Sequence, residues 1–401
     1  MIAICTAIIV HFKHLPLSMA CSGSRNGVHA GASSYIPVRS RRGRIPRMSI
    51  PLLSTKPDCA EALERVATWL KGDVLGRPPI RFSAHNSEYG SRDRSLGRSW
   101  PDLEHRWRDV QYQIDLYEHD LPHGSYLAET FPIYWPNLGP GVYAAMHGCH
   151  VAFGEVTSWT EPVADLRSVA MDWSHRSIAD LDAMTKLSIE RSQGRWYTGY
   201  TDLHGSLDCL ADWRSPQQLC LDLMDDEDLV DDLQVIAEES FVPVFDRYDA
   251  MLKAAGQPSC NWMGIPVDGR LHIPSCDFAF MISPAQFRRF YEASLGRELA
   301  AMTHNIFHLD GKGVARHLDR LLADPRINAI QWVQGCGDDQ PIMQWLPLIK
   351  KVQAAGKGII VDLKPDELDG FIRATGREGI YLCIDAPVAD QPDIIKRVAR
   401  W

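Results

Sequence analysis

The C-terminal third of the chain alternates between short apolar segments and segments with helical periodicity, and this regularity limits the possible folds more than any other feature. The apolar segments typical of strands are residues 305–310, 327–333, 358–363 and 379–385. Between them lie residues 314–322, 341–355 and 365–375, whose apolar residues recur at helical spacing. Parallel strands need helical crossovers of this kind. The sequence therefore predicts an α/β fold built on a parallel sheet.

The length of the chain selects among the parallel α/β folds. Its 401 residues exceed the roughly 250 residues of a typical eight-stranded barrel. No G-x-G-x-x-G follows any predicted strand, which removes the commonest reason to expect an open dinucleotide-binding sheet. We therefore expect a single (β/α)8 TIM barrel over residues 48–401, with an N-terminal helical or irregular extension.

The N-terminal half of the sequence is less regular. A helix is expected after Lys56, and a strand is expected after the turn at Gly76–Ile80. Residues 81–142 mix aromatic residues, Arg and Pro in irregular order, which favours long functional loops. Residues 222–239 are acidic with an apolar stripe, which predicts one solvated amphipathic helix.

Residues 1–47 differ from the rest of the chain in charge. Asp58 is the first acidic residue, although the whole chain carries a formal net charge of -9. We expect residues 1–47 to be a basic leader outside the barrel, either disordered or preceding a native start at Met48. An organelle transit peptide or a poor secretory signal are the other interpretations. The expected location is the cytoplasm, with import directed by the leader as the alternative.

Deleting residues 1–47 is expected to leave the thermal midpoint of unfolding nearly unchanged, because this segment has no periodic apolar face to pack on the barrel. Thermal and denaturant unfolding of the full and shortened chains would measure the difference. A loss of about 2 kcal/mol or more would show that the leader contributes to the folded structure.

Composition narrows the classes of partner. A net charge of -9 argues against a nucleic-acid-binding protein, which needs clustered Lys and Arg to neutralise phosphates. The apolar segment Ile2–Val10 is too short to span a bilayer, and no longer one follows. The ten cysteines include no C-x-x-C pair, which indicates reduced thiols rather than a disulfide framework. We expect a small-molecule substrate, with neither nucleic acid nor membrane as a partner.

A candidate metal site lies at the ends of the predicted strands, where barrel enzymes place their active sites. His308 and Asp310 are two residues apart on one strand, so both side chains project to the same face. Cys383 ends the last strand and is expected to reach the same centre across the barrel. Imidazole, carboxylate and thiolate are all zinc ligands, and three protein ligands leave an open position for catalysis. The alternatives are a hydrogen-bonded histidine and a small buried cysteine.

Other polar residues also follow predicted strands. Asp277 comes after the apolar segment 271–275, and Gln331 and Gln334 lie at the end of the segment 327–333. We expect Asp277 and Gln331 to position the substrate at the same mouth. An aspartate that only orders its loop is the alternative for Asp277.

Three segments in this order resemble the uroporphyrinogen decarboxylase superfamily. They are Cys276–Phe278 with Ile282–Phe287, then Phe307–Gly311, followed by the closing strand and helix units. The resemblance covers about residues 59–399. This superfamily contains the decarboxylases and the zinc-dependent methyltransferases that serve corrinoid proteins and cobalamin-independent methionine synthesis.

The methyltransferase branch is the more similar one. Its zinc is held by a His-x-Cys pair and a later Cys, so the resemblance implies His308 and Cys383 as ligands, with Asp310 where the first cysteine would stand. It implies a metal-dependent methyltransferase or demethylase that acts with a corrinoid, a corrinoid protein or a methylated small molecule. Asp277, Asp310 and Gln331 are then the expected catalytic residues.

Two alternatives remain open. One is a metal-free decarboxylase of a tetrapyrrole or another polycarboxylate, in which Arg81 and Arg92, with Gln334, bind the substrate. The family's Arg-Gln-Ala-Gly-Arg-Tyr run is absent, although residues 77–98 are rich in arginine. The other is a non-catalytic barrel that binds a corrinoid or tetrapyrrole.

Overall fold

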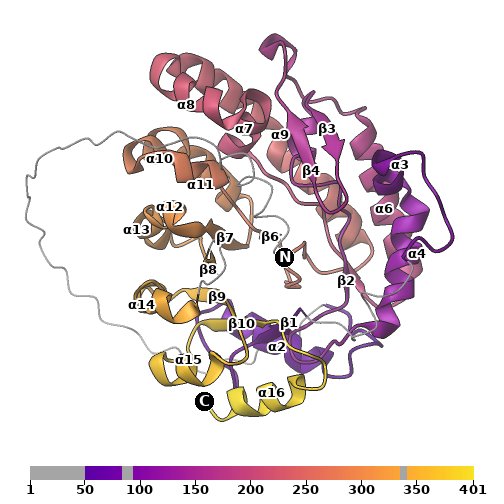
Figure 1. Ribbon diagram of the computed structural model, residues 1–401, viewed down its shortest axis with the longest axis vertical. Coiled ribbons are helices and arrows are strands. Elements are labelled where there is room, and N and C mark those ends of the chain that lie inside the picture. The colour runs from indigo at the N-terminus through magenta and orange to yellow at the C-terminus, as the bar shows by residue number, and fades with distance from the viewer. Residues whose placement is uncertain (1–49, 84–93, 335–340) are drawn as a thin grey trace, which may run out of the picture.

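Six parallel strands form the main sheet, in the spatial order β1-β10-β9-β8-β7-β6. This computed structural model describes residues 50–83, 94–334 and 341–401. The strands are β1 Ile80–Phe82, β6 Leu271–His272, β7 His304–Asp310, β8 Ala329–Val333, β9 Gly358–Leu363 and β10 Ile380–Ile384. The sheet curls as a half-barrel (Figure 1). The predicted parallel α/β architecture is confirmed.

Helices connect these strands along the outer side of the sheet (Figure 1). They are α10 Pro284–Phe290, α11 Glu292–Ala300, α12 Gly311–Ala315, α13 Leu318–Ala323, α14 Leu346–Ala354 and α15 Leu368–Ala374, and α16 Gln391–Ala399 follows the last strand. Each of the last three buries apolar residues three or four positions apart, such as Leu368 and Phe371 in α15. This spacing places them on one helix face, which packs on the sheet. The helix expected at 314–322 is two short helices, α12 and α13.

The remaining strands form two small sheets. β2 (Ile133–Tyr134) and β5 (Tyr197–Thr198) are parallel, whereas β3 (His150–Phe153) and β4 (Ser158–Glu161) form an antiparallel pair. Two further helices, α2 (Cys59–Trp69) and α5 (Val142–Ala145), precede β1 and β3. The helix expected after Lys56 and the strand after Gly76–Ile80 are therefore confirmed by α2 and β1.

Side chains from neighbouring segments bond the outer edges of the six-stranded sheet. On β1, the Ile80 N–H donates to Glu129 Oε2 (2.7 Å) and the Phe82 N–H donates to Thr130 Oγ1 (2.9 Å). On β6, the Leu271 N–H donates to Ser259 Oγ (3.0 Å), and its carbonyl accepts from the Tyr200 hydroxyl (2.8 Å). These bonds satisfy edge groups that would otherwise be buried without partners.

The prediction of long loops over residues 81–142 is wrong for much of that range. It contains the helices α3 (Leu103–Arg108) and α4 (Val110–Asp120). Asp102 and Asp109 cap them by accepting from the amides of the third helical residues. Capping by Asp offsets the weak helical periodicity of this segment.

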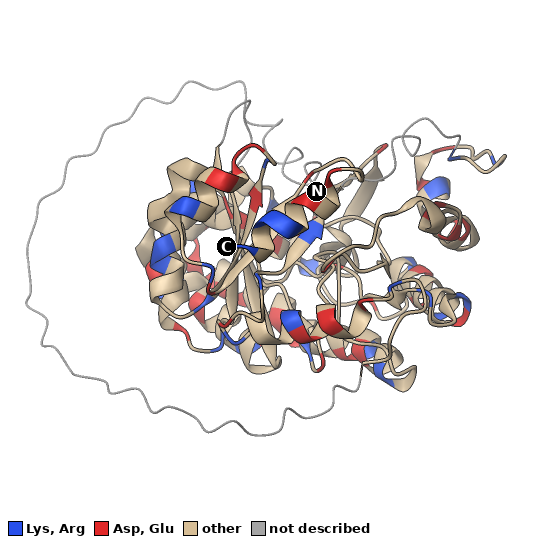
Figure 2. Cartoon of the chain, turned by 90° about the horizontal axis from the view of Figure 1, so that it is seen from below, with Lys and Arg blue, Asp and Glu red and all other residues tan. Residues whose placement is uncertain are grey.

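The prediction of one uninterrupted helix at 222–239 is also wrong. This segment is divided between α8 (Pro216–Asp225) and α9 (Glu227–Ala254), because Asp226 caps α9 through the Leu229 N–H. Two further helices, α6 (Arg176–Ser192) and α7 (Ser206–Arg214), complete this half of the chain. Basic and acidic residues are interspersed along the helices in Figure 2, and some form exposed ion pairs such as Arg289 with Asp231 (2.6 Å).

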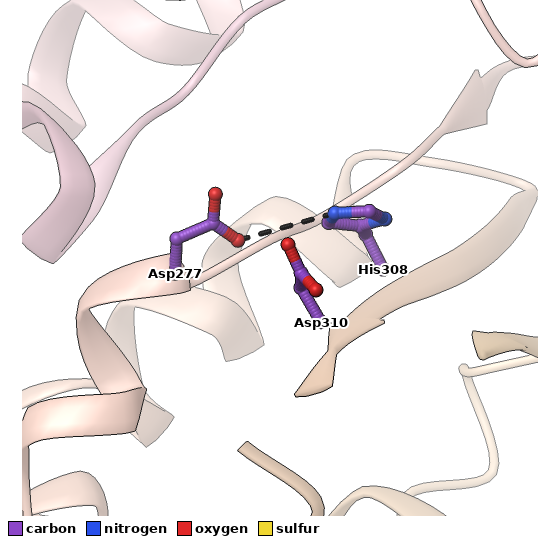
Figure 3. Close-up of side chains that lie close together, drawn as sticks. All are labelled: Asp277, His308 and Asp310. Carbon is purple, nitrogen blue, oxygen red and sulfur yellow. Dashed lines mark ion pairs between the residues drawn. The ribbon is translucent and has the colours of Figure 1, made fainter. Parts of the chain in front are cut away.

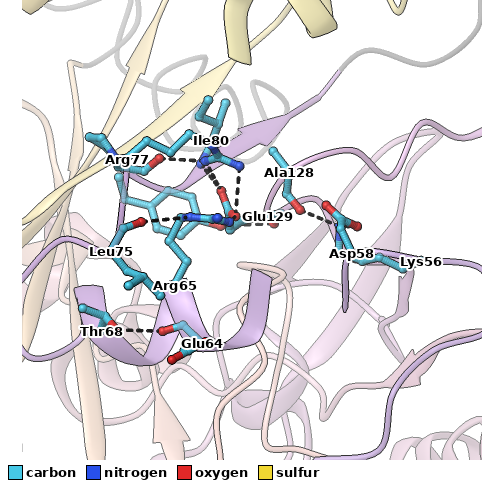
Figure 4. A network of polar contacts seen from close by, with 12 residues as sticks. Lys56, Asp58, Glu64, Arg65, Thr68, Leu75, Arg77, Ile80, Ala128 and Glu129 are labelled. Carbon is cyan, nitrogen blue, oxygen red and sulfur yellow. Dashed lines mark hydrogen bonds and ion pairs between the residues drawn. The ribbon is translucent and has the colours of Figure 1, made fainter. Parts of the chain in front are cut away.

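A buried carboxylate joins α2, β1 and the segment before β2 (Figure 4). Glu129 is 0% exposed, and its carboxylate accepts from Arg65, Arg77 and the Ile80 N–H. Its own N–H donates to the Ile80 carbonyl (2.8 Å). Nearby, Lys56 donates to Asp58 (2.9 Å) and to backbone carbonyls. Among the residues described, no helix is both long and apolar enough to cross a membrane.

Candidate metal centre

Three potential metal ligands converge where β6 and β7 end. Asp277 begins the 3-10 helix η5 (Asp277–Met281), whereas His308 and Asp310 lie on β7. One ligand atom from each side chain lies within 4.8 Å of the others. His308 Nε2 is 4.0 Å from Asp277 Oδ1, and Figure 3 shows the three side chains pointing toward one another. The structure thus brings together His308 and Asp310, as the strand spacing predicts, and adds Asp277.

The backbone explains why Asp277 reaches β7. The His308 N–H donates to the Pro274 carbonyl (2.9 Å), and Ser275 and His308 form a parallel bridge. The chain therefore follows β7 for three residues beyond β6, as far as Ser275, before turning. Asp208 then accepts from the N–H groups of Asp277 (3.0 Å) and Phe278 (2.9 Å), which holds the start of η5 in place.

The end of η5 is held by a second local motif. Ser283 caps α10 in a capping box, in which it bonds the Gln286 amide and the Gln286 side chain returns to the Ser283 N–H (3.0 Å). Pro284 occupies the first turn of α10, a position where its missing N–H costs no helical hydrogen bond. The turn that carries Asp277 is thus fixed at both ends.

Gln331 controls the orientation of His308. The Gln331 side-chain oxygen on β8 is hydrogen-bonded to His308 Nδ1, so Nε2 is the ring nitrogen that faces Asp277. Trp262 packs edge-on against the imidazole, with ring centres 5.6 Å apart. A histidine whose second nitrogen is held by a hydrogen bond is typical of metal sites. Gln331 therefore contacts a predicted ligand, and its expected role in positioning the substrate stays a prediction.

Asp277 is the electrostatically unusual member of the group. Burial and the neighbouring Asp208 charge raise the pKa of Asp277 to about 7, although His308 opposes this shift. Its Oδ1 is buried without a hydrogen-bond partner among the described residues. An unpartnered buried carboxylate is costly, and a cation would remove that cost. One imidazole and two carboxylates also suit zinc, so the side chains present fit a metal ion.

Cys383 is outside this group. It lies on β10 in register with Arg81 of β1, and its thiol is hydrogen-bonded to Arg81 and Asp362. Burial raises the pKa of Cys383 to about 12, so the thiolate that binds metals is disfavoured. β8 and β9 separate β10 from β7, and three strand spacings amount to about 14 Å along the sheet.

Two of the predicted substrate-binding residues, Arg81 and Gln334, form hydrogen bonds with other groups of the protein. Arg81 donates to the Met263 carbonyl as well as to Cys383. Gln334 donates to the Asp362 carbonyl (2.8 Å), which ties the end of β8 to β9. Arg92 lies outside the described residues.

The sequence analysis missed three polar residues next to the metal centre. Asp202 and His204 follow β5, and Asp208 lies on α7. His204 Nε2 is 2.8 Å from Asp202 Oδ2, and its Nδ1 is 3.7 Å from Asp208 Oδ2. Burial favours the neutral imidazole, but the two carboxylates outweigh it and hold the pKa of His204 well above its usual value. β5 has only two residues, too few for a strand pattern to be detected.

Neither the protein-family models nor the curated proteins compared with this chain include a match.

Proposed function

We propose that this protein is a metal-dependent enzyme that transfers a methyl group, with Asp277, His308 and Asp310 holding a zinc ion. The convergence of these three ligand atoms within 4.8 Å is the observation that carries the proposal. Their place at the carboxyl ends of parallel strands supports it, because α/β enzymes bind substrates there. The resemblance to the zinc-dependent methyltransferases supplies the reaction class.

The residues around the ion have distinct roles in this proposal. A zinc ion bound there would act as a Lewis acid that lowers the pKa of a thiol or water ligand. Gln331 keeps Nε2 of His308 directed into the site through its hydrogen bond with Nδ1. Asp208 positions Asp277 through two backbone amides. The methyl donor is a corrinoid, delivered by a corrinoid protein, or a methylated small molecule.

We also propose that β2 and β5 complete an eight-stranded barrel with the six-stranded sheet. The contacts of Glu129 and Thr130 with β1, and of Tyr200 and Ser259 with β6, support this closure. In a closed barrel the metal centre and the residues after β5 share one mouth.

Decarboxylation of a polycarboxylate has weaker support. It needs arginines that are free to bind substrate carboxylates, but Arg77 pairs with Glu129 (2.7 Å) and Arg98 with Asp115 (2.5 Å). Arg94 pairs with Asp120 (2.8 Å), and Arg81 bonds Met263 and Cys383. The arginines described between residues 77 and 98 therefore already have protein partners.

Metal analysis of the purified full chain tests the proposal. After incubation with zinc and removal of the excess, about one zinc ion per chain is expected, because three protein ligands converge on one position. Asp277→Asn should reduce the bound zinc strongly, since the amide oxygen carries no charge.

Asp362→Asn is the matched control for this experiment. Asp362 is also a carboxylate near the end of a strand of the same sheet, on β9, but it lies outside the three-residue group. Its variant should keep zinc at the level of the unaltered chain. A chain that binds no zinc, or equal losses in the two variants, would refute the metal centre.

A further inference from the structure

A small cavity lies beside the metal centre, beyond the carboxyl ends of β2 and β5. Its volume is about 170 Å³, and its lining includes Trp107, Trp135, Asn137, Thr157 and Asp202. Pockets for drug-sized ligands measure about 300 to 1,000 Å³. The cavity therefore suits a compact ligand.

The lining combines aromatic rings with a carboxylate. Trp107 comes from α3 and Trp135 directly follows β2, and Asp202 is buried after β5. Tryptophan attracts cations through the negative face of its ring, and this attraction strengthens where water is excluded. Aromatic walls around one carboxylate are the usual surroundings of a methylated ammonium group, which cannot donate ordinary hydrogen bonds.

The charges around the cavity favour a cation. His204 Nε2 lies 2.8 Å from Asp202 Oδ2 and its Nδ1 lies 3.7 Å from Asp208 Oδ2, so one imidazole is placed between two carboxylates. Arg106, the residue before Trp107, pairs with Glu155 (2.7 Å) and adds no net charge.

One donor in the cavity wall has no partner. The Nε1–H of Trp135 is buried without an acceptor among the residues that the structure describes. A buried N–H without an acceptor is unfavourable, and an oxygen on the ligand would satisfy it. These residues suit a ligand with a methylated cationic end, and a neutral oxygen on that ligand is the acceptor that the Trp135 N–H lacks.

We propose that this cavity binds a small methylated ammonium compound that carries a hydroxyl or carbonyl oxygen. The contacts Asp202–His204, His204–Asp208 and Asp208–Asp277 connect it to the metal centre. The role of this compound as the methyl-bearing substrate rests on the proposed methyl transfer. The binding of this compound does not depend on methyl transfer, because the cavity lining contains none of the three proposed metal ligands.

Calorimetric titration of the full chain with choline tests the inference. The comparison ligand is 3,3-dimethyl-1-butanol, which has the same shape and hydroxyl but carbon in place of the charged nitrogen. Choline is expected to bind at least about tenfold more tightly, because only the cation gains from Trp135 and Asp202. Absence of choline binding, or equal affinity for both compounds, would overturn the inference.

Substitutions locate the binding. Trp135→Leu and Asp202→Asn should each weaken choline binding by about tenfold or more, while Trp135→Phe keeps an aromatic face and loses less. Trp173→Leu is the matched control, since Trp173 lines a different cavity. Circular dichroism checks that each variant is folded. Unchanged choline affinity in folded Trp135→Leu would place the binding elsewhere.

Treatment with a chelator separates this inference from the proposed function. Choline binding should persist when zinc is removed, because it depends on the cavity alone. Choline binding in a chain that cannot bind zinc would support the cavity and refute the metal centre. Zinc binding without choline binding would support the metal centre and refute the ligand proposed for the cavity.

Discussion

Glu129→Ala is expected to lower the free energy of unfolding by about 3 to 5 kcal/mol, the usual cost of removing one member of a buried ion pair. Glu129 is fully buried and bonds Arg65, Arg77 and the Ile80 amide. Without it, two guanidinium groups and the edge of β1 lose their acceptor. Equilibrium denaturation of the full chain measures the loss.

Two further variants define the cause of that loss. Glu129→Gln keeps the size and one acceptor oxygen, so it should be destabilising by less than Glu129→Ala. Asp231→Ala breaks the exposed ion pair with Arg289 and should change stability by only about 0 to 1 kcal/mol. Equal effects of Glu129→Ala and Asp231→Ala would contradict the structural role of Glu129.

Asp310→Asn is expected to weaken zinc binding by about 100-fold or more, because even residues that only support ligands cost 10- to 100-fold. Asp310→Cys should keep zinc affinity within about tenfold, since a thiolate suits zinc and the two-residue spacing from His308 is retained. Competition with a chromogenic zinc chelator measures both affinities.

The order of these two variants distinguishes two roles for Asp310. If it only accepts hydrogen bonds in a metal-free site, Asn should be the milder change and Cys the harsher one. His308→Ala provides the reference for complete loss of a ligand, and it should leave the chain folded. Tight zinc binding in His308→Ala would show that zinc is held elsewhere.

Local patterns in the sequence were sufficient for the parallel strands and helices of the C-terminal third. The strands β7 to β10 and their helices are long enough for the periodicity of their apolar residues to be visible. The type of each element and the parallel direction of the strands could therefore be predicted. The N-terminal half could not be predicted as well. β2 and β5 have two residues each, and α3 and α4 depend on aspartate caps rather than on a long apolar stripe.

The candidate site shows the same division. The sequence by itself determined that His308 and Asp310 share one face, because alternation along a strand is a local property. Only the tertiary structure decided the third member of the group. Asp277 reaches β7 through the bridge at Ser275, whereas Cys383 is held three strands away by Arg81 and Asp362. The distance between side chains on different strands depends on strand order and backbone pairing, which no local pattern encodes.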